Sequence, residues 1–210
     1  MEVSDNKSNS IDFLWHRFQR GDYVVLGDLF QKLYKELYYY GLKLVFIPDL
    51  VKDTIQDIFA DVWSRRQKME KIRNIRAYLF ISVRRELLRR VEKFRKEGLL
   101  REGAVSSLEF SKEDFIIQEE TGSEAMSLLM QSLKRLTERQ REVIFLRFNH
   151  ELEFSEIASI LGMNVQSVRN LLFRALEKVR NDLNNTGISG SADVEMFLLI
   201  VFYQIRKEYI

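Results

Sequence analysis

Three aspartates spaced four residues apart, Asp53, Asp57 and Asp61, are the first residues whose types and spacing could do chemistry. This spacing places them on one face of an α-helix. Aligned carboxylates could hold a metal ion, but a metal site needs further ligands, and His16 and His150 are isolated in the sequence. We therefore expect no metal, no cofactor and no catalytic residue here. The aspartates form either an ordinary solvated face or a docking surface for a basic partner.

A strongly basic segment follows the aspartates. Residues 65–96 carry 13 basic and 3 acidic side chains, net +10, although the formal net charge of the whole chain is only +2. Lysine and arginine neutralise phosphates, and aromatic rings among them, here Tyr78 and Phe80, can stack on unpaired bases. The segment therefore predicts binding to opened DNA. The alternative is that Tyr78 belongs to the core and the arginines only solubilise the helix.

The third chemical feature is a helix-turn-helix pattern between Phe154 and Phe173. Ala158 is small enough for two helices to pack closely, and Gly162 permits the positive φ that the turn needs. The second helix would expose side chains that can contact base edges or phosphates. These are Gln166, Ser167, Arg169, Asn170 and Arg174. A plain three-helix core with a polar surface is the alternative.

The elements that must position these residues are helical. A chain of 210 residues with one proline and nine glycines has too few turn residues for a sandwich or barrel of short strands. We expect an all-α fold of two helical domains joined by a flexible acidic linker, the second domain being a helix-turn-helix domain. The predicted segments are a domain at 11–96, a linker at 97–124, a domain at 125–183 and a tail at 184–210.

Within the first domain, apolar periodicity predicts helices at 11–20, from residue 26, at 50–66 and at 75–96. Pro48 separates two of them, and residues 67–74 read as a short basic loop. In the second domain, Thr137 and Gln140 form a capping box, and Asn164 is a natural N-cap. The side chains expected to face inward from the last helix of the first domain are Tyr78, Leu79, Ile81, Ser82, Leu88 and Val91.

No targeting or membrane-spanning segment is apparent in the sequence. The longest apolar run, 196–203, is far shorter than the ~20 residues that a membrane-spanning helix needs. The polar start of the chain lacks the apolar core of a signal peptide. We expect a cytoplasmic protein. The apolar run could dock an inhibitor or pair with another chain, but we expect it to pack on the second domain.

Several motifs occur in the order and spacing of a known family. Asp53-x-x-Gln56-Asp57-x-Phe59-x-x-x-Trp63 is similar to D-x-x-Q-E-x-F-x-x-x-W, and Arg76-Ala77-Tyr78-Leu79 is similar to R-A-W-L. Leu136 to Val143 resembles L-P-x-x-x-R-E-V, and Glu156-Ile157-Ala158 to Leu161-Gly162 fits the helix-turn-helix. Over about 11–183 the chain resembles the extracytoplasmic-function group of bacterial RNA polymerase sigma factors.

The resemblance implies a non-enzymatic protein that binds core RNA polymerase and directs promoter recognition. It implies promoter DNA as second partner and admits an anti-sigma factor, with no small-molecule substrate. The polymerase-binding residues would be Asp53, Gln56, Asp57, Asp61 and Trp63. The minus-ten DNA would be bound by Lys71, Arg73, Asn74, Arg76, Tyr78, Arg84, Arg85 and Arg89. The minus-thirty-five DNA would be bound by Gln166, Ser167, Arg169, Asn170 and Arg174.

The chain departs from the family at specific positions. Arg85 and Arg89 stand where the family often has asparagine and aspartate, and Glu151 replaces a turn glycine. We expect Asn149 to supply the left-handed residue of that turn instead. A helix-turn-helix regulator that is not a polymerase subunit remains the alternative function. The polymerase-binding motif beside the basic segment argues against it, and an enzyme using the aspartates would need a pocket with further ligands.

Overall fold

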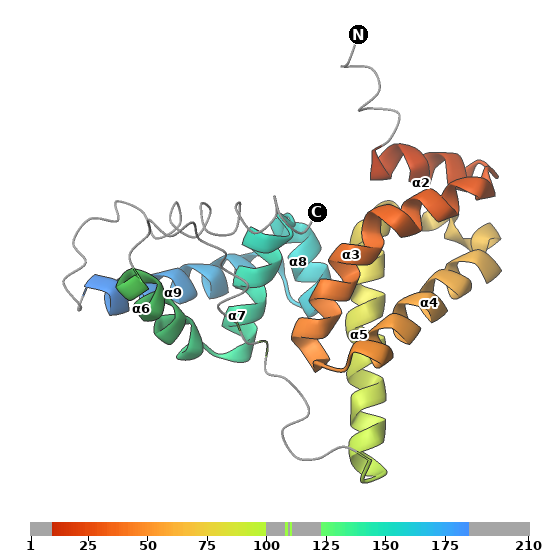
Figure 1. Ribbon diagram of the computed structural model, residues 1–210. Helices are drawn as coiled ribbons and strands as arrows, with labels where there is room; N and C mark the ends of the chain where they lie inside the picture. Colours follow the sequence, from red (N-terminus) through yellow and green to blue (C-terminus); the bar gives the residue numbers. More distant parts are fainter. Residues whose placement is uncertain (1–9, 100–107, 109, 111–122, 185–210) are drawn as a thin grey trace. The chain divides into compact units, whose positions relative to one another are not determined.

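The computed structural model describes residues 10–99, 108, 110 and 123–184 (Figure 1). Every regular element in these ranges is a helix, which confirms the all-α fold class. The chain divides into two compact units, with the boundary between Ser106 and Ser107. The tail and most of the acidic linker lie outside the described residues.

The described residues of the first unit form four α-helices and two short 3₁₀ helices. These are α2 (Ile11–Gln19), η1 (Tyr23–Val25), α3 (Leu26–Val45), α4 (Pro48–Ser64), η2 (Arg66–Lys71) and α5 (Ile75–Lys96). Ser10 begins α2 by accepting a hydrogen bond from the Phe13 amide, and Asn74 begins α5 in the same way from Ala77. Pro48 does not interrupt a helix but starts α4, because the first helical residue does not need its N–H.

The core of the first unit lies where α3, α4 and α5 meet, and Figure 1 shows these helices side by side. Helix α5 buries Phe80, Val83 and Leu87 there, together with Leu79 and Val91. The expected inward face of this helix was therefore partly wrong, because the other four side chains proposed for it are only half-buried. Those four are Tyr78, Ile81, Ser82 and Leu88.

The described part of the second unit is a helical bundle that includes the predicted helix-turn-helix. It contains α6 (Ser123–Lys134), α7 (Glu138–Ile144), the π-helical turn η4 (Phe145–Asn149), α8 (Phe154–Leu161) and α9 (Val165–Asn184). Helices α6, α7 and α8 all contact α9. The predicted capping box of Thr137 and Gln140 is present. Gly162 adopts φ 63°, and Asn164 Oδ1 accepts a hydrogen bond from the Ser167 amide at 2.7 Å.

The turn before α8 differs from expectation in one residue. Glu151, not Asn149, is the left-handed residue, with φ 50°. Asn149 is buried in η4, where its backbone continues the helical path. Glu153 is the N-cap of α8 and forms a capping box with Glu156.

Two residues of the expected linker belong to the second unit. Leu108 and Phe110 are buried. The guanidinium of Arg141, itself buried, donates a hydrogen bond from Nε to the Leu108 carbonyl at 2.7 Å and another from Nη1 to the Leu136 carbonyl. Because a buried arginine must have its donors satisfied, Arg141 ties this part of the chain to α7.

Helices α3 and α4 can approach closely because α3 has no side chain at Gly41. A Cβ built there would lie 2.6 Å from Val51 Cγ1 and 3.1 Å from Leu87 Cδ1. A valine side chain is stiff about χ1 and cannot move aside easily. By contrast, a Cβ at Gly27, in the first turn of the same helix, would meet nothing within 4 Å.

This contrast predicts opposite effects of the same substitution. Gly41→Ala should lower the free energy of unfolding by about 1–2 kcal/mol, because overpacking exceeds the gain in helix propensity. Gly27→Ala should raise it by up to about 1 kcal/mol, because only the propensity changes. Urea unfolding of the full chain measures both. Equal shifts in the same direction would show that the crossing at Gly41 is not tight.

Candidate nucleic-acid and protein interfaces

Helix α4 presents the predicted acidic face to solvent. Asp53, Gln56, Asp57 and Asp61 are all exposed, because the opposite face of the helix is buried in the core. Asp57 and Asp61 are each ion-paired, with Arg90 of α5 at 2.6 Å and with Arg65 at 3.2 Å respectively. The structure thus brings the predicted carboxylates together on one face, but arginines already neutralise part of their charge.

Trp63 ends this face as a partly exposed ring held between neighbours. The Tyr23 ring meets it edge-on at 5.7 Å, and the guanidinium of Arg66 lies 4.7 Å from its centroid. Arg66 also donates a hydrogen bond from Nη1 to the Trp63 carbonyl at 3.0 Å. A cation over an aromatic face is attracted to it, so Arg66 fixes the ring orientation. Sequence reasoning did not assign a role to Arg66.

The segment between α4 and α5 is not a loop throughout. Residues 66–71 form η2, and Met69 within it is buried. Helix α2 holds the segment from outside: Trp15 Nε1 donates to the Ile72 carbonyl at 2.7 Å, and Gln19 Nε2 donates to the same oxygen at 2.9 Å. Lys71 and Arg73 remain exposed on this braced segment.

Two of the residues expected to bind opened DNA also have structural contacts. Asn74 Oδ1 accepts the Ala77 amide at 2.9 Å as the N-cap of α5. Arg76 is mostly buried and forms an ion pair with Glu36 of α3 at 2.8 Å. Of the two aromatics expected to interleave with the cations, Phe80 is fully buried in the core, and only Tyr78 has partial exposure. The stacking role predicted for Phe80 is therefore wrong.

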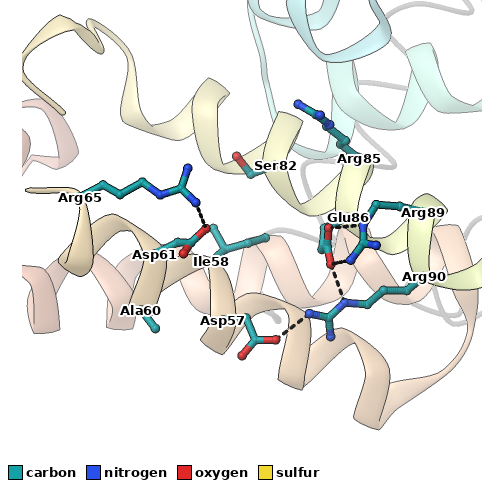
Figure 2. A pocket seen from close by; sticks show the side chains of 10 residues that line it. All are labelled: Asp57, Ile58, Ala60, Asp61, Arg65, Ser82, Arg85, Glu86, Arg89 and Arg90. Atoms are coloured by element: carbon teal, nitrogen blue, oxygen red, sulfur yellow. Dashed lines mark hydrogen bonds and ion pairs between the residues drawn. The ribbon is translucent and has the colours of Figure 1, made fainter. Parts of the chain in front are cut away.

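The remaining predicted cations of α5, Arg84, Arg85 and Arg89, lie along its outer surface, with Arg84 half-buried and the other two exposed. Arg85 and Arg89 line a cavity of about 580 Å³ between α4 and α5 (Figure 2). Its other lining residues are Asp57, Ile58, Ala60, Asp61, Arg65, Ser82, Glu86 and Arg90. The pocket is thus bordered by the acidic face of one helix and the basic face of the next.

Glu86 is the shared counter-ion of this pocket. It accepts hydrogen bonds from Arg89 at 2.6 Å and 2.9 Å and from Arg90 at 2.8 Å. The Arg89 hydrogen bond is the main cause that lowers the pKa of Glu86 from 4.5 to about 2; the Arg90 hydrogen bond adds to it, and partial burial opposes both. Glu86 is therefore ionised at any physiological pH.

Helix α9 presents the predicted recognition surface of the second unit. Gln166, Arg169, Asn170 and Arg174 are exposed and Ser167 is half-buried, because Val168, Leu172 and Ala175 form the inward stripe. Gln166 Nε2 donates to Asn170 Oδ1 at 3.0 Å, so these two amides form a pair. The structure places all five predicted residues on one helix, and all but Ser167 are well exposed.

An aromatic ring organises the cations beside this helix. The guanidinium of Arg169 lies 5.4 Å from the centroid of Phe154, and that of Arg147 lies 5.0 Å from the same centroid. Arg147 also donates from Nη1 to the Leu152 carbonyl at 2.9 Å. Sequence reasoning missed Phe154 and Arg147, because these contacts join residues of three separate elements and leave no local pattern.

The part of the chain that the structure describes has neither clustered metal ligands nor a membrane-spanning helix. No group of histidine, aspartate and glutamate there is arranged to hold a metal ion. Among the described helices, none is both long enough and apolar enough to cross a membrane.

Comparisons with known proteins identify the family. Residues 126–179 match the family model described as Sigma-70, region 4. The RNA polymerase sigma-E factor of Streptomyces coelicolor is 30% identical over 139 residues, which cover 65% of this chain and 75% of that protein. The chain belongs to the extracytoplasmic-function group of RNA polymerase sigma factors. The ECF RNA polymerase sigma factor SigK of Mycobacterium bovis is 22% identical over 180 residues, covering 84% and 95% of the two chains.

A solved structure shares the fold of this sigma factor. CnrH, determined in complex with the cytosolic domain of CnrY, aligns with a TM-score of 0.55 and 21% sequence identity. The alignment covers 84% of this chain and 99% of CnrH. In this chain, the match to region 4 falls on the unit that contains α8 and α9.

The pKa of Glu86 predicts a pH-dependent stability. A carboxyl group whose pKa is lower in the folded chain stabilises the fold above its unfolded-state pKa, and this contribution fades as the pH falls through the folded value. Wild type should therefore be more stable than Glu86→Gln at pH 7. The difference should shrink below about pH 5 and vanish near pH 2, because a protonated carboxyl resembles an amide.

Urea unfolding of both proteins between pH 7 and pH 2 checks this expectation. Glu92→Gln is the matched control, since Glu92 also pairs with arginine on α5 but is more exposed. Exposed pairs contribute little, so the control should show almost no pH-dependent difference. A gap for Glu86→Gln that persists unchanged at pH 2 would contradict the ionic origin of its effect.

Proposed function

We propose that this sigma factor binds core RNA polymerase and directs it to promoters by a division of labour between its two units. The observation that carries the proposal is the exposed recognition face of α9 in the unit that matches region 4. Residues 11–96 act as the region 2-like domain, 97–124 as the acidic linker, 125–183 as the region 4-like domain and 184–210 as a tail. The protein works in the cytoplasm and supplies no catalytic chemistry of its own.

The polymerase-binding surface is the exposed face of α4. Asp53, Gln56, Asp57 and Asp61 attract a basic partner helix, and Trp63 adds an apolar contact at one end. Electrostatic complementarity of this kind speeds association and sets the register of two proteins. The fixed orientation of the Trp63 ring reduces the entropy lost on binding.

The minus-ten DNA is held by the basic surface of α5 and the braced segment before it. Lys71, Arg73, Arg84, Arg85 and Arg89 contribute positive charge, and Tyr78 contributes the exposed part of its ring. The segment before α5 is suited to hold an unpaired base, because hydrogen bonds from Trp15 and Gln19 fix its backbone. Asn74 and Arg76 support this surface chiefly through the N-cap and the ion pair with Glu36.

The minus-thirty-five element is read by α9 in the major groove. Arg169 is the residue best placed to read a base, since Phe154 limits the conformations of its guanidinium. Gln166, Ser167, Asn170 and Arg174 complete the surface. Because the sigma factor RpoE of Bartonella quintana, a structural neighbour of this chain with 21% sequence identity and a TM-score of 0.50, was solved in complex with the anti-sigma factor NepR, we further propose an anti-sigma factor as a regulator of this chain.

Transcription in vitro with core polymerase and a promoter library tests the proposal. Initiation that depends on the added protein, at promoters sharing upstream and minus-ten elements, is the expected outcome. Initiation that is the same with and without the protein would refute it. Operator-like DNA binding without any effect on core polymerase would instead favour an ordinary helix-turn-helix regulator.

Reversal of one charge on α4 should weaken polymerase binding without weakening binding to the upstream DNA element. Asp57→Lys is expected to weaken the affinity for core polymerase by at least about tenfold, because like charges at an interface are costly. Binding of the full chain to upstream-element duplex should not change. Asp28→Lys, at an exposed acid in the first turn of α3, is the matched control. Equal loss of polymerase and duplex binding by Asp57→Lys would contradict the division of labour.

Arg169→Ala should reduce discrimination at one base pair of the upstream element. The expected loss is about 1–3 kcal/mol on the preferred sequence and little on sequences altered at that pair. Holoenzyme binding to single-base variants of the element measures this difference. A uniform loss on every sequence would assign Arg169 to phosphate contact rather than base readout.

A further inference from the structure

A chain of ion pairs connects the acidic face of α4 to the basic face of α5. The Arg90 guanidinium donates from Nη2 to Asp57 Oδ2 at 2.6 Å and from Nε to Glu86 Oε1 at 2.8 Å. Glu86 in turn accepts from Arg89 (Figure 2). Arg90 lies 33 residues from Asp57 in sequence, so only the packing of α5 on α4 creates this connection.

The members of this chain differ in their exposure to solvent. The side chains of Arg90 and Glu86 are 23% and 25% exposed, whereas that of Asp57 is 64% exposed. Ion pairs shielded from water are screened less than exposed pairs. Partial burial by itself would lower the pKa of Arg90, but the hydrogen bonds that it donates to Asp57 and Glu86 raise the pKa, so its charge is permanent. Glu86 therefore holds the guanidinium of Arg90 at Nε, and Nη2 of the same guanidinium donates to Asp57.

The geometry at Asp57 leaves room for a second cation. A carboxylate has about four lone-pair sites, and Arg90 approaches Oδ2 alone through one N–H. The large exposure of Asp57 means that a partner can reach the carboxylate without displacing Arg90. Arg90 therefore restricts the side-chain conformations of Asp57 before any partner arrives. Such preorganisation strengthens binding by reducing the entropy lost at the interface.

We propose that Arg90, braced by Glu86, is a positioning residue that orients Asp57 for core RNA polymerase. This inference rests on the proposed role of Asp57 in polymerase binding. Arg90 would then contribute to polymerase binding, although it belongs to α5, the helix otherwise proposed to bind DNA. The bound polymerase cation and Arg90 then share the Asp57 carboxylate.

The opposing expectation is simple competition, in which Arg90 neutralises Asp57 and so weakens its attraction for a basic partner. The two cases differ in kinetics. Loss of a competing charge raises the association rate and tightens binding, whereas loss of a positioning contact speeds dissociation. The structure favours positioning, because Glu86 holds Arg90 in place independently of Asp57.

Kinetic binding of the full chain to core polymerase tests the proposal with four proteins: wild type, Arg90→Met, Asp57→Asn and the double variant. Methionine keeps the aliphatic stem that packs between the helices but removes the guanidinium. Arg90→Met should raise the dissociation rate about three- to tenfold, within the range of coupled neighbouring residues. In the Asp57→Asn background it should add less than about twofold, because the side chain to be positioned has lost its charge.

Two further variants guard against an effect on folding. Arg95→Met removes an exposed arginine of α5 that pairs with Glu92 outside the network, and it should leave the dissociation rate unchanged. Arg90→Lys keeps the charge without the forked donors and should fall between wild type and Arg90→Met. Thermal unfolding curves of all variants confirm that each is folded at the temperature of measurement.

The outcomes separate this inference from the proposed function. If Asp57→Asn speeds dissociation but Arg90→Met leaves it unchanged or slows it, the positioning role is refuted and the polymerase interface stands. The positioning role is likewise refuted if Arg90→Met changes the dissociation rate equally in the wild-type and Asp57→Asn backgrounds. If neither Asp57→Asn nor Arg90→Met alters binding, both the interface at Asp57 and the positioning role fail.

Discussion

The first unit depends on one constraint: α5 must form part of the core and carry eight basic side chains at the same time. It buries Phe80, Val83 and Leu87 against α3 and α4, and arginines occupy much of its remaining surface. Like charges crowded on one helix repel one another and destabilise it. Ion pairs with acidic residues reduce this repulsion. Glu36 pairs with Arg76, and Glu86 pairs with both Arg89 and Arg90.

This arrangement divides the cations of α5 into two groups. Arg76 and Arg90 are mostly buried and bridge to α3 and α4, so they hold helices together. Arg85 is exposed on the surface of the pocket and is available to an anionic partner. A strongly basic segment is therefore not a uniform DNA-binding surface. The acidic face of α4 and the basic face of α5 also border the same pocket. The surfaces proposed to bind polymerase and DNA are therefore neighbours.

In the second unit, the main structural requirement is a fixed position for α9 and its exposed side chains. Gly162 and Asn164 set the turn and the start of α9, and the buried guanidinium of Arg141 ties α7 to the chain before α6. Phe154 then limits the motion of Arg169. A side chain that reads a base loses less entropy on binding when it is already held near its bound conformation.

Much of this architecture could be predicted from the sequence, because its signals are local. Helix ends depend on caps such as Ser10, Asn74 and Thr137, whose hydrogen bonds span three residues. The helix-turn-helix depends on Ala158 and Gly162 at a fixed spacing within a regular apolar pattern. The exposure of the acidic face of α4 follows from the same periodicity, since its buried residues occupy the opposite side.

Only the tertiary structure decided which stripe of α5 faces the core and which charges pair across helices. The helix has apolar residues on more than one side, so periodicity alone favoured Tyr78 where the packing of α3 and α4 buries Phe80. The pairs Arg90–Asp57 and Arg76–Glu36 join residues 33 and 40 positions apart, and Arg169 meets Phe154 across a turn. The sequence by itself determined the helices, their caps and their amphipathic faces, because these arise from contacts within a few residues. The partners of each charge depend on distances through space, which exist only once the helices have packed.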